Sequence, residues 1–151
     1  MRLQFIHADL FYLNDVDTLV CPVNCVGTMG NGLALAFKLR FPADLFHQYR
    51  EICLSGKLGP GNCWLYKGTE VNVLCFATKD HWMYDSKLEW IKRGLTACID
   101  NLPKHGIRDI AFPLLGCGKG GLSPDVVIET FKEVFDNDVY EELDLNVTVC
   151  L

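Results

Sequence analysis

The sequence predicts an α/β domain of three layers (α/β/α), in which helices cover both faces of a mixed, largely parallel sheet. Short, nearly all-apolar runs, typical of buried parallel strands, alternate along the chain with segments of helical periodicity. Two of these runs, 18–23 and 109–115, lead directly into glycine-rich loops at 24–32 and 116–121. Glycine loops that follow strands and precede helices indicate a sheet that binds its ligand at the carboxyl ends of its strands.

The first half of the chain carries signals for four strands and two helices. We expect strands at 3–6, 18–23, 63–66 and 73–77, and helices at 33–41 and 42–54. The first helix must end near Phe41 because Pro42 cannot continue it, whereas Pro42 suits the first turn of the second helix. A turn at 67–69 separates the third and fourth strands.

The second half carries signals for two helices and two strands. Ser86, with a glutamate three residues later, forms a capping-box signature, and apolar residues at helical spacing continue from there to the next proline. A strand follows at 109–115, and Ser123-Pro124 begins a helix that continues to about residue 135. The segment 146–151 is expected to be the last strand.

Length and composition fit a single domain that spans residues 1–151. Half of the residues are hydrophobic and 22% are charged, as in ordinary globular proteins. The eight cysteines lie mostly inside apolar runs, which favours free thiols in a reducing cytoplasm over disulfides or zinc. No signal peptide and no apolar run of the ~18 residues that span a bilayer is visible. We therefore expect a soluble, cytoplasmic protein that does not bind membranes.

The balance of charge limits the kinds of partner. A net charge of −5 argues against non-specific binding of long nucleic acid, which depends on a basic face that neutralises phosphates. A nucleic-acid substrate would have to be gripped locally.

The two glycine-rich loops predict a cradle for a diphosphate. Consecutive backbone amides of such loops can point at anionic oxygens because glycine lacks the β-carbon that would block them. Gly116, Gly118 and Gly121 match the dinucleotide fingerprint, but the chain that follows is too short for a second nucleotide-binding half. Neither loop ends as a P-loop does, which disfavours hydrolysis of a nucleotide γ-phosphate. Tight turns that serve packing alone remain the alternative.

The runs Val23–Ala34 and Phe112–Leu122 resemble those of a macrodomain, and the likeness covers nearly the whole chain. The segments 77–82 and 86–91 are similar to DarG-type antitoxin macrodomains and to their relative, the human terminal ADP-ribose glycohydrolase. The resemblance implies a macrodomain that binds ADP-ribose and removes it from modified thymidine in single-stranded DNA. Such an enzyme would reverse the action of a DarT-type toxin, which uses NAD.

The resemblance also implies contacts with ADP-ribose. Asp9 would accept a hydrogen bond from the adenine amino group, Leu10 would pack against adenine, and Asn24 would orient the distal ribose. Without the resemblance, Asp9 and Asn24 are ordinary turn or cap residues. The other implied contacts are Gly30, Asn31, Gly32, Leu33, Thr78, Gly116, Cys117, Gly118, Lys119 and Gly120.

Lys79 is the residue that the resemblance makes catalytic. It follows the strand at 73–77 and should lie at the same sheet edge as the loops, although a lysine at a strand end is more often a solvated charge. In a desolvated site a neutral amine could attack the anomeric carbon of the distal ribose, or the charged ammonium could guide water and the leaving base. The human relative has an acidic residue where this chain has Gly120, so no lysine–aspartate pair is implied.

His81 and Trp82 are accessory candidates. A histidine can relay a proton near neutral pH, and an indole can stack on an unpaired base. Packing of Trp82 on the sheet edge is an equal alternative. No cofactor and no metal are expected, because no cluster of acidic residues or histidines is visible.

Two other functions are compatible with the same pocket. The domain could remove ADP-ribose from protein carboxylates or deacylate acetylated ADP-ribose, or it could be a reader that binds ADP-ribose without catalysis. DarG-type antitoxins carry a further C-terminal region that engages the toxin, which this chain lacks. We therefore expect an excised domain or a stand-alone relative, monomeric, with a DarT-type toxin as the possible partner.

Overall fold

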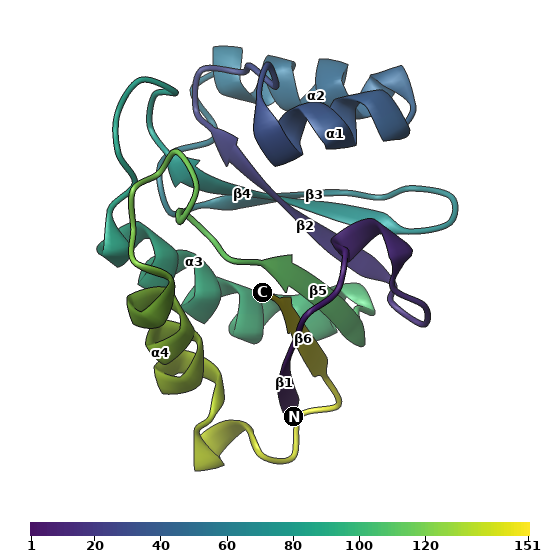
Figure 1. Cartoon of the computed structure of the whole chain (residues 1–151). Helices are drawn as coiled ribbons and strands as arrows, with labels where there is room; N and C mark the ends of the chain where they lie inside the picture. The colour runs from purple at the N-terminus through teal and green to yellow at the C-terminus, as the bar shows by residue number, and fades with distance from the viewer.

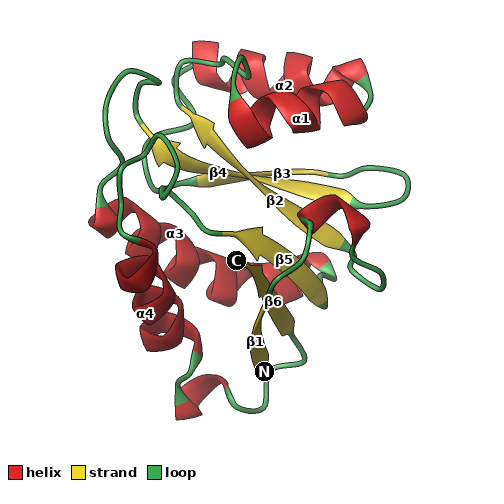
Figure 2. Ribbon diagram, viewed as in Figure 1, coloured by secondary structure: helices red, strands yellow, loops and turns green.

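The computed structural model describes all residues, 1–151, as one sheet with helices on both faces (Figure 1, Figure 2). The strands are β1 (Arg2–Ile6), β2 (Thr18–Asn24), β3 (Cys63–Tyr66), β4 (Asn72–Lys79), β5 (Asp109–Pro113) and β6 (Asn146–Cys150). The helices are α1 (Gly32–Arg40), α2 (Ala43–Leu54), α3 (Leu88–Asn101) and α4 (Pro124–Phe135). The sequence pattern did not predict three short 3-10 helices at Leu10–Tyr12, Leu102–His105 and Asp138–Tyr140.

The sheet has the order β1-β6-β5-β2-β4-β3. All neighbouring strands are parallel except β3, which pairs antiparallel with β4. This confirms the prediction of a mixed, largely parallel sheet. Because parallel strands end at the same edge, the segments that follow β2, β4 and β5 gather there.

Two apolar clusters attach the helices to the sheet. One lies between the sheet and the pair α3 and α4, where Phe76, Phe112 and Phe131 are buried. The other lies between the sheet and the pair α1 and α2, where Phe37 and Tyr49 are buried. Figure 2 shows the two helix pairs on opposite sides of the strands. The three layers that the sequence predicts are therefore present, and no helix is both long and apolar enough to cross a bilayer.

The capping-box prediction at Ser86 is wrong. Helix α3 begins at Leu88, and Lys87 occupies its N-cap without a side-chain hydrogen bond. The Ser86 amide instead donates to the carbonyl oxygen of Gly120 (2.9 Å), which fixes Ser86 outside the helix. Its hydroxyl is buried and has no hydrogen-bond partner. Ser86 is therefore held by the second glycine loop and is not part of the helix start.

Gly94 in α3 gives a prediction for stability. A β-carbon at this position would overlap the buried ring of Phe76. Gly94→Ala should lower the free energy of unfolding by about 1–3 kcal/mol, because overpacking outweighs a gain of about 1 kcal/mol in helix propensity. Urea unfolding measures the change. Thr96→Ala, on the exposed side of the same helix, is the control and should stay within about 0.5 kcal/mol of the wild type. A Gly94→Ala protein as stable as the wild type would contradict the packing argument.

Candidate functional site

The ends of β2 and β4 bring Asn24 and Lys79 together. The register shifts by one residue between Val23 and Asn24, so that Asn24 pairs with Lys79. Pairing continues past both strands, because the Cys25 amide donates to the carbonyl oxygen of Asp80 (3.1 Å). The backbone of Lys79 therefore lies beside the start of the first glycine loop, as the sequence predicts.

The side chain of Asn24 holds the first glycine loop. Its Oδ1 accepts from the amides of Val26 (3.1 Å), Gly27 (3.1 Å) and Thr28 (3.3 Å), and its Nδ2 donates to Thr28 Oγ1 (2.8 Å). The hydroxyl of Tyr49, in α2, donates to the Asn24 carbonyl oxygen (2.6 Å) and to Oδ1 (2.9 Å). Asn24 therefore has the local role of a turn residue in this structure, whatever it adds to ligand binding.

Sequence reasoning missed Tyr49. Its only signal was the spacing of Leu45, Tyr49 and Cys53 on one face of α2, which indicates burial and not a hydrogen bond to a loop. Burial raises the pKa of the Tyr49 hydroxyl well above its usual range, so it remains protonated and able to donate.

The first loop ends at the N-terminus of α1, and this end of the loop borders open space. Gly27 has φ +92° and packs so closely on α2 that a β-carbon would lie 3.3 Å from Cys53 Cβ. At Gly30 and Gly32, by contrast, a β-carbon would meet nothing within 4 Å. Asn31 between them is exposed, and its side chain does not cap the helix. The uncapped amides of a helix start are suited to bind an anionic group.

The second glycine loop closes on itself. The Leu122 amide donates to the carbonyl oxygen of Gly116 (2.9 Å), and Gly116 has φ +71°. A β-carbon at Gly120 would overlap the Gly116 carbonyl and lie 2.5 Å from Ser86 Oγ. A β-carbon at Gly118 would meet nothing within 4 Å. Gly116 and Gly120 are thus required by the loop itself, whereas Gly118 borders open space.

Lys79 has no carboxylate partner. It is half-buried, and its Nζ donates to the carbonyl oxygen of Trp82 (3.2 Å). Lys79 takes part in none of the chain's three salt bridges. His81, also half-buried, uses Nδ1 to accept from the Met83 amide (3.0 Å), while Trp82 is exposed. Both accessory candidates therefore lie in the segment that contacts Lys79.

The remaining predicted contacts differ in how open they are. Asp9 is exposed, although its Oδ1 accepts from the Phe11 amide (2.9 Å) and so caps a 3-10 helix. Burial raises the pKa of the Cys150 thiol at the end of β6, and the negative charge of Asp9 adds to this rise. The Asp9 carboxylate therefore lies near that strand end. Leu10 is buried in the core, which leaves little of its surface for adenine. Thr78 is also buried, Leu33 and Cys117 are half-buried, and Lys119 is exposed.

The thiols near this edge are poor nucleophiles. Burial, together with Cys53 and the Asp80 carboxylate, raises the pKa of Cys25 to about 12. Burial also raises the pKa of Cys117 above its usual value. A protonated thiol attacks carbon poorly, so neither cysteine is a good candidate nucleophile. No group of three histidine, cysteine or acidic residues is placed to hold a metal ion.

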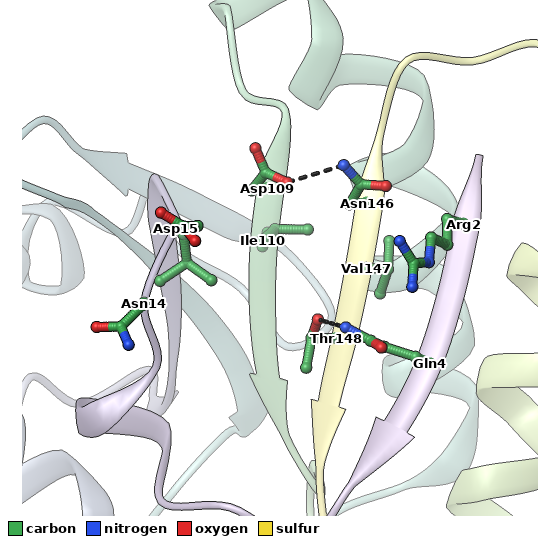
Figure 3. Close-up of a pocket in the computed structure, with 10 residues that line it drawn as sticks. Arg2, Gln4, Asn14, Asp15, Asp109, Ile110, Asn146, Val147 and Thr148 are labelled. Carbon is green, nitrogen blue, oxygen red and sulfur yellow. Dashed lines mark hydrogen bonds between the residues drawn. The ribbon is translucent and has the colours of Figure 1, made fainter.

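Two cavities lie away from Lys79. The larger, about 310 Å³, is at the opposite edge of the sheet, where β1, β5 and β6 begin (Figure 3). Arg2 and Gln4 line it, and Asn146 donates to Asp109 (2.8 Å) at its rim. The other, about 260 Å³, lies between the first loop and α2 and includes Gly30. Lys79 and the second loop line neither cavity.

Comparison with known proteins identifies close relatives of this chain. A family model described as Macro domain matches residues 20–131. A DNA ADP-ribosyl glycohydrolase of Mycobacterium tuberculosis is 36% identical over 132 residues, which are 82% of this chain but 37% of that protein. The human ADP-ribose glycohydrolase OARD1 is 26% identical over 150 residues, which are 98% of this chain and 90% of that protein. The chain thus spans little more than a third of the DNA-directed relative.

Solved structures agree with this comparison. The macrodomain of Thermus aquaticus DarG matches with a TM-score of 0.87 and 31% identity, over 99% of this chain and 97% of that one. Thermosipho africanus DarTG in complex with ADP-ribose matches with a TM-score of 0.88 and 31% identity, over 99% of this chain and 41% of that one. Both structures share the fold of this chain, and the second is a complex with ADP-ribose.

Tyr49→Phe should loosen the first glycine loop. The change removes the hydroxyl that donates to Asn24, at a cost of about 0.5–1.5 kcal/mol in the free energy of unfolding. Hydrogen exchange of the amides at 26–28 should become faster. Tyr66→Phe is the matched control, because it removes a hydroxyl that donates to Asp44 elsewhere (2.7 Å). If both variants leave the loop amides equally protected, Tyr49 does not hold the loop.

Proposed function

The chain belongs to the macro domain family, and we propose that it is a glycohydrolase that removes ADP-ribose from thymidine in single-stranded DNA. The observation that carries the proposal is the position of Lys79, without a carboxylate partner, beside the first glycine loop at the sheet edge where both loops lie. The names of the relatives that are 34–36% identical, DNA ADP-ribosyl glycohydrolases, support the same reaction.

We propose that ADP-ribose lies along the carboxyl edge of the sheet. The exposed carboxylate of Asp9 takes the adenine end, over the end of β6. The diphosphate lies between Gly30–Leu33, at the start of α1, and the second loop at Gly116–Gly120, where Gly118 leaves open space. The distal ribose then reaches Asn24 and Lys79, which are paired across β2 and β4. The complex of Thermosipho africanus DarTG with ADP-ribose supports this choice of ligand.

The reaction breaks the bond between thymine and the anomeric carbon of the distal ribose. In one route the neutral amine of Lys79 forms a bond to that carbon, while thymine leaves and takes up a proton. Water then hydrolyses the adduct, which releases ADP-ribose and regenerates the Lys79 amine. In the other route the charged ammonium orients water and the departing base. Binding of adenine and diphosphate contributes to the rate because it holds the anomeric carbon against Lys79. Neither route requires a metal ion or a cofactor.

The substrate is proposed to come from a DNA-modifying transferase. A relative from Thermosipho africanus, 34% identical over 145 residues, is named as a fusion of a DNA ADP-ribosyl transferase with a DNA ADP-ribosyl glycohydrolase. A DarT-type toxin is therefore the proposed source of the modified DNA and the proposed partner of this chain. We also propose that this chain is a monomer and acts in the cytoplasm.

A protein-directed glycohydrolase is the second candidate. The match to the human ADP-ribose glycohydrolase OARD1, over 98% of this chain, supports this candidate. The lower identity, 26% against 36%, favours the DNA-directed reaction. Release of ADP-ribose from a carboxylate-linked peptide, but not from a thymidine-modified oligonucleotide, would select the second candidate.

Lys79→Ala should slow release of ADP-ribose from a thymidine-modified single-stranded oligonucleotide by about 10²- to 10⁴-fold. Affinity for free ADP-ribose, measured by calorimetry, should change little, because the loops bind most of the ligand. Lys79→Arg separates the routes, since a guanidinium stays charged: it should be as inactive as Lys79→Ala if the amine attacks. Lys87→Ala, a change of an exposed lysine in the same segment, is the control. A wild type that binds ADP-ribose and releases none would be a reader.

Gly118→Ala and Gly120→Ala form a matched pair that locates the diphosphate. Gly118→Ala should fold with wild-type stability, because its β-carbon enters open space, but bind ADP-ribose at least about tenfold more weakly, or ~1.4 kcal/mol. Gly120→Ala should lower the free energy of unfolding by about 1–3 kcal/mol, because its β-carbon meets the Gly116 carbonyl. Calorimetry and urea unfolding measure the two effects. Wild-type affinity in Gly118→Ala would move the diphosphate away from this loop.

A further inference from the structure

The segment between β4 and α3 exposes three large apolar side chains in a row. Trp82, Met83 and Tyr84 are 52%, 64% and 66% exposed. The other large apolar side chains that are exposed occur singly along the chain. A single exposed apolar residue is ordinary, whereas adjacent ones form a contiguous apolar surface, the kind of surface that binding sites use.

Both ends of this segment are tied to the glycine loops. Near its start, the carbonyl oxygen of Asp80 accepts from the Cys25 amide of the first loop (3.1 Å). At its end, the Ser86 amide donates to Gly120 of the second loop (2.9 Å). The segment therefore spans the two sides of the proposed ADP-ribose site.

Its interior is ordered by His81. The Met83 amide donates to His81 Nδ1 (3.0 Å), and the Tyr84 amide donates to the His81 carbonyl oxygen (3.1 Å). The His81 ring centroid lies 5.1 Å from that of Trp82 and 5.5 Å from that of Tyr84. The rings thus form a cluster on a fixed backbone, which reduces the entropy lost when a flat ligand stacks on them.

We propose that this cluster, His81, Trp82 and Tyr84, is a stacking platform for the unpaired DNA bases next to the modified thymine. The inference rests on the proposed function, because it gives the DNA strand its place at that site. Lys79 Nζ donates to the Trp82 carbonyl oxygen (3.2 Å), so a strand on the platform lies next to the amine. Every base has a flat face, and stacking on aromatic rings therefore needs no particular DNA sequence.

The charge of the segment supports stacking as the main contribution. Within 79–87, two lysines are balanced by two aspartates, Asp80 and Asp85. The chain as a whole carries −5, so neutralisation of phosphates supplies little affinity. Binding of the strand should accordingly depend only weakly on salt, unlike binding by a basic groove.

Binding of an unmodified, fluorescently labelled oligothymidylate to the full chain tests the platform directly. Trp82→Ala should weaken binding by about 5- to 150-fold, the range for one lost stacking contact, while Trp82→Phe keeps a flat ring and most of the affinity. Tyr12→Ala, which removes a tyrosine that is 71% exposed on another segment, should leave the affinity unchanged. Equal binding by the wild type and Trp82→Ala would overturn the proposal, as would a steep salt dependence that persists in Trp82→Ala.

Hydrolysis separates the platform from the reaction. Trp82→Ala should slow release of ADP-ribose from the modified oligonucleotide but not from the modified mononucleoside, and should leave affinity for free ADP-ribose unchanged. An equal loss on both substrates would overturn the platform and assign Trp82 to the placement of Lys79. A wild type that releases nothing from either substrate would refute the proposed function, while oligothymidylate binding still decides whether the platform exists.

Discussion

The pairing of β2 with β4 is the constraint on which the site depends. The one-residue shift after Val23 places Lys79, and not Thr78, opposite Asn24. Because neighbouring residues of a strand face opposite sides of a sheet, a shift of one residue changes which side chain borders the loop. The pairing continues as a hydrogen bond between Cys25 and Asp80, so the backbone alone fixes the lysine beside the first glycine loop.

The two glycine loops reach their shapes by different physical means. In the first, a single side chain holds the loop. Asn24 accepts hydrogen bonds from three loop amides, and its own carbonyl oxygen accepts one from the Tyr49 hydroxyl. In the second, the backbone folds on itself, which is possible only because Gly116 and Gly120 lack β-carbons. Glycines that pack and glycines that border open space look alike in a sequence, so only the structure tells Gly118 from Gly120.

The sequence predicted the elements well because their signals are local. Apolar runs marked the strands, and Pro42 and Pro124 marked the beginnings of α2 and α4 within a residue. What it missed depends on contacts between distant segments. Ser86 has the sequence pattern of a helix cap, but its backbone amide instead donates a hydrogen bond to Gly120 of the second loop. The site residues were named by resemblance to a family, since no local rule distinguishes a catalytic lysine from a solvated one.

The partner of Lys79 bears on how it can react. A backbone carbonyl, here that of Trp82, accepts a hydrogen bond from either a neutral amine or an ammonium. A carboxylate in its place would favour the charged form through its full negative charge. The Trp82 carbonyl therefore positions Nζ in either protonation state, and Lys79 takes part in no salt bridge, so both proposed routes are open to it. Burial raises the pKa of the neighbouring Cys25 and Cys117 thiols, which disfavours their nucleophilic thiolate forms, so neither thiol competes with the role proposed for Lys79.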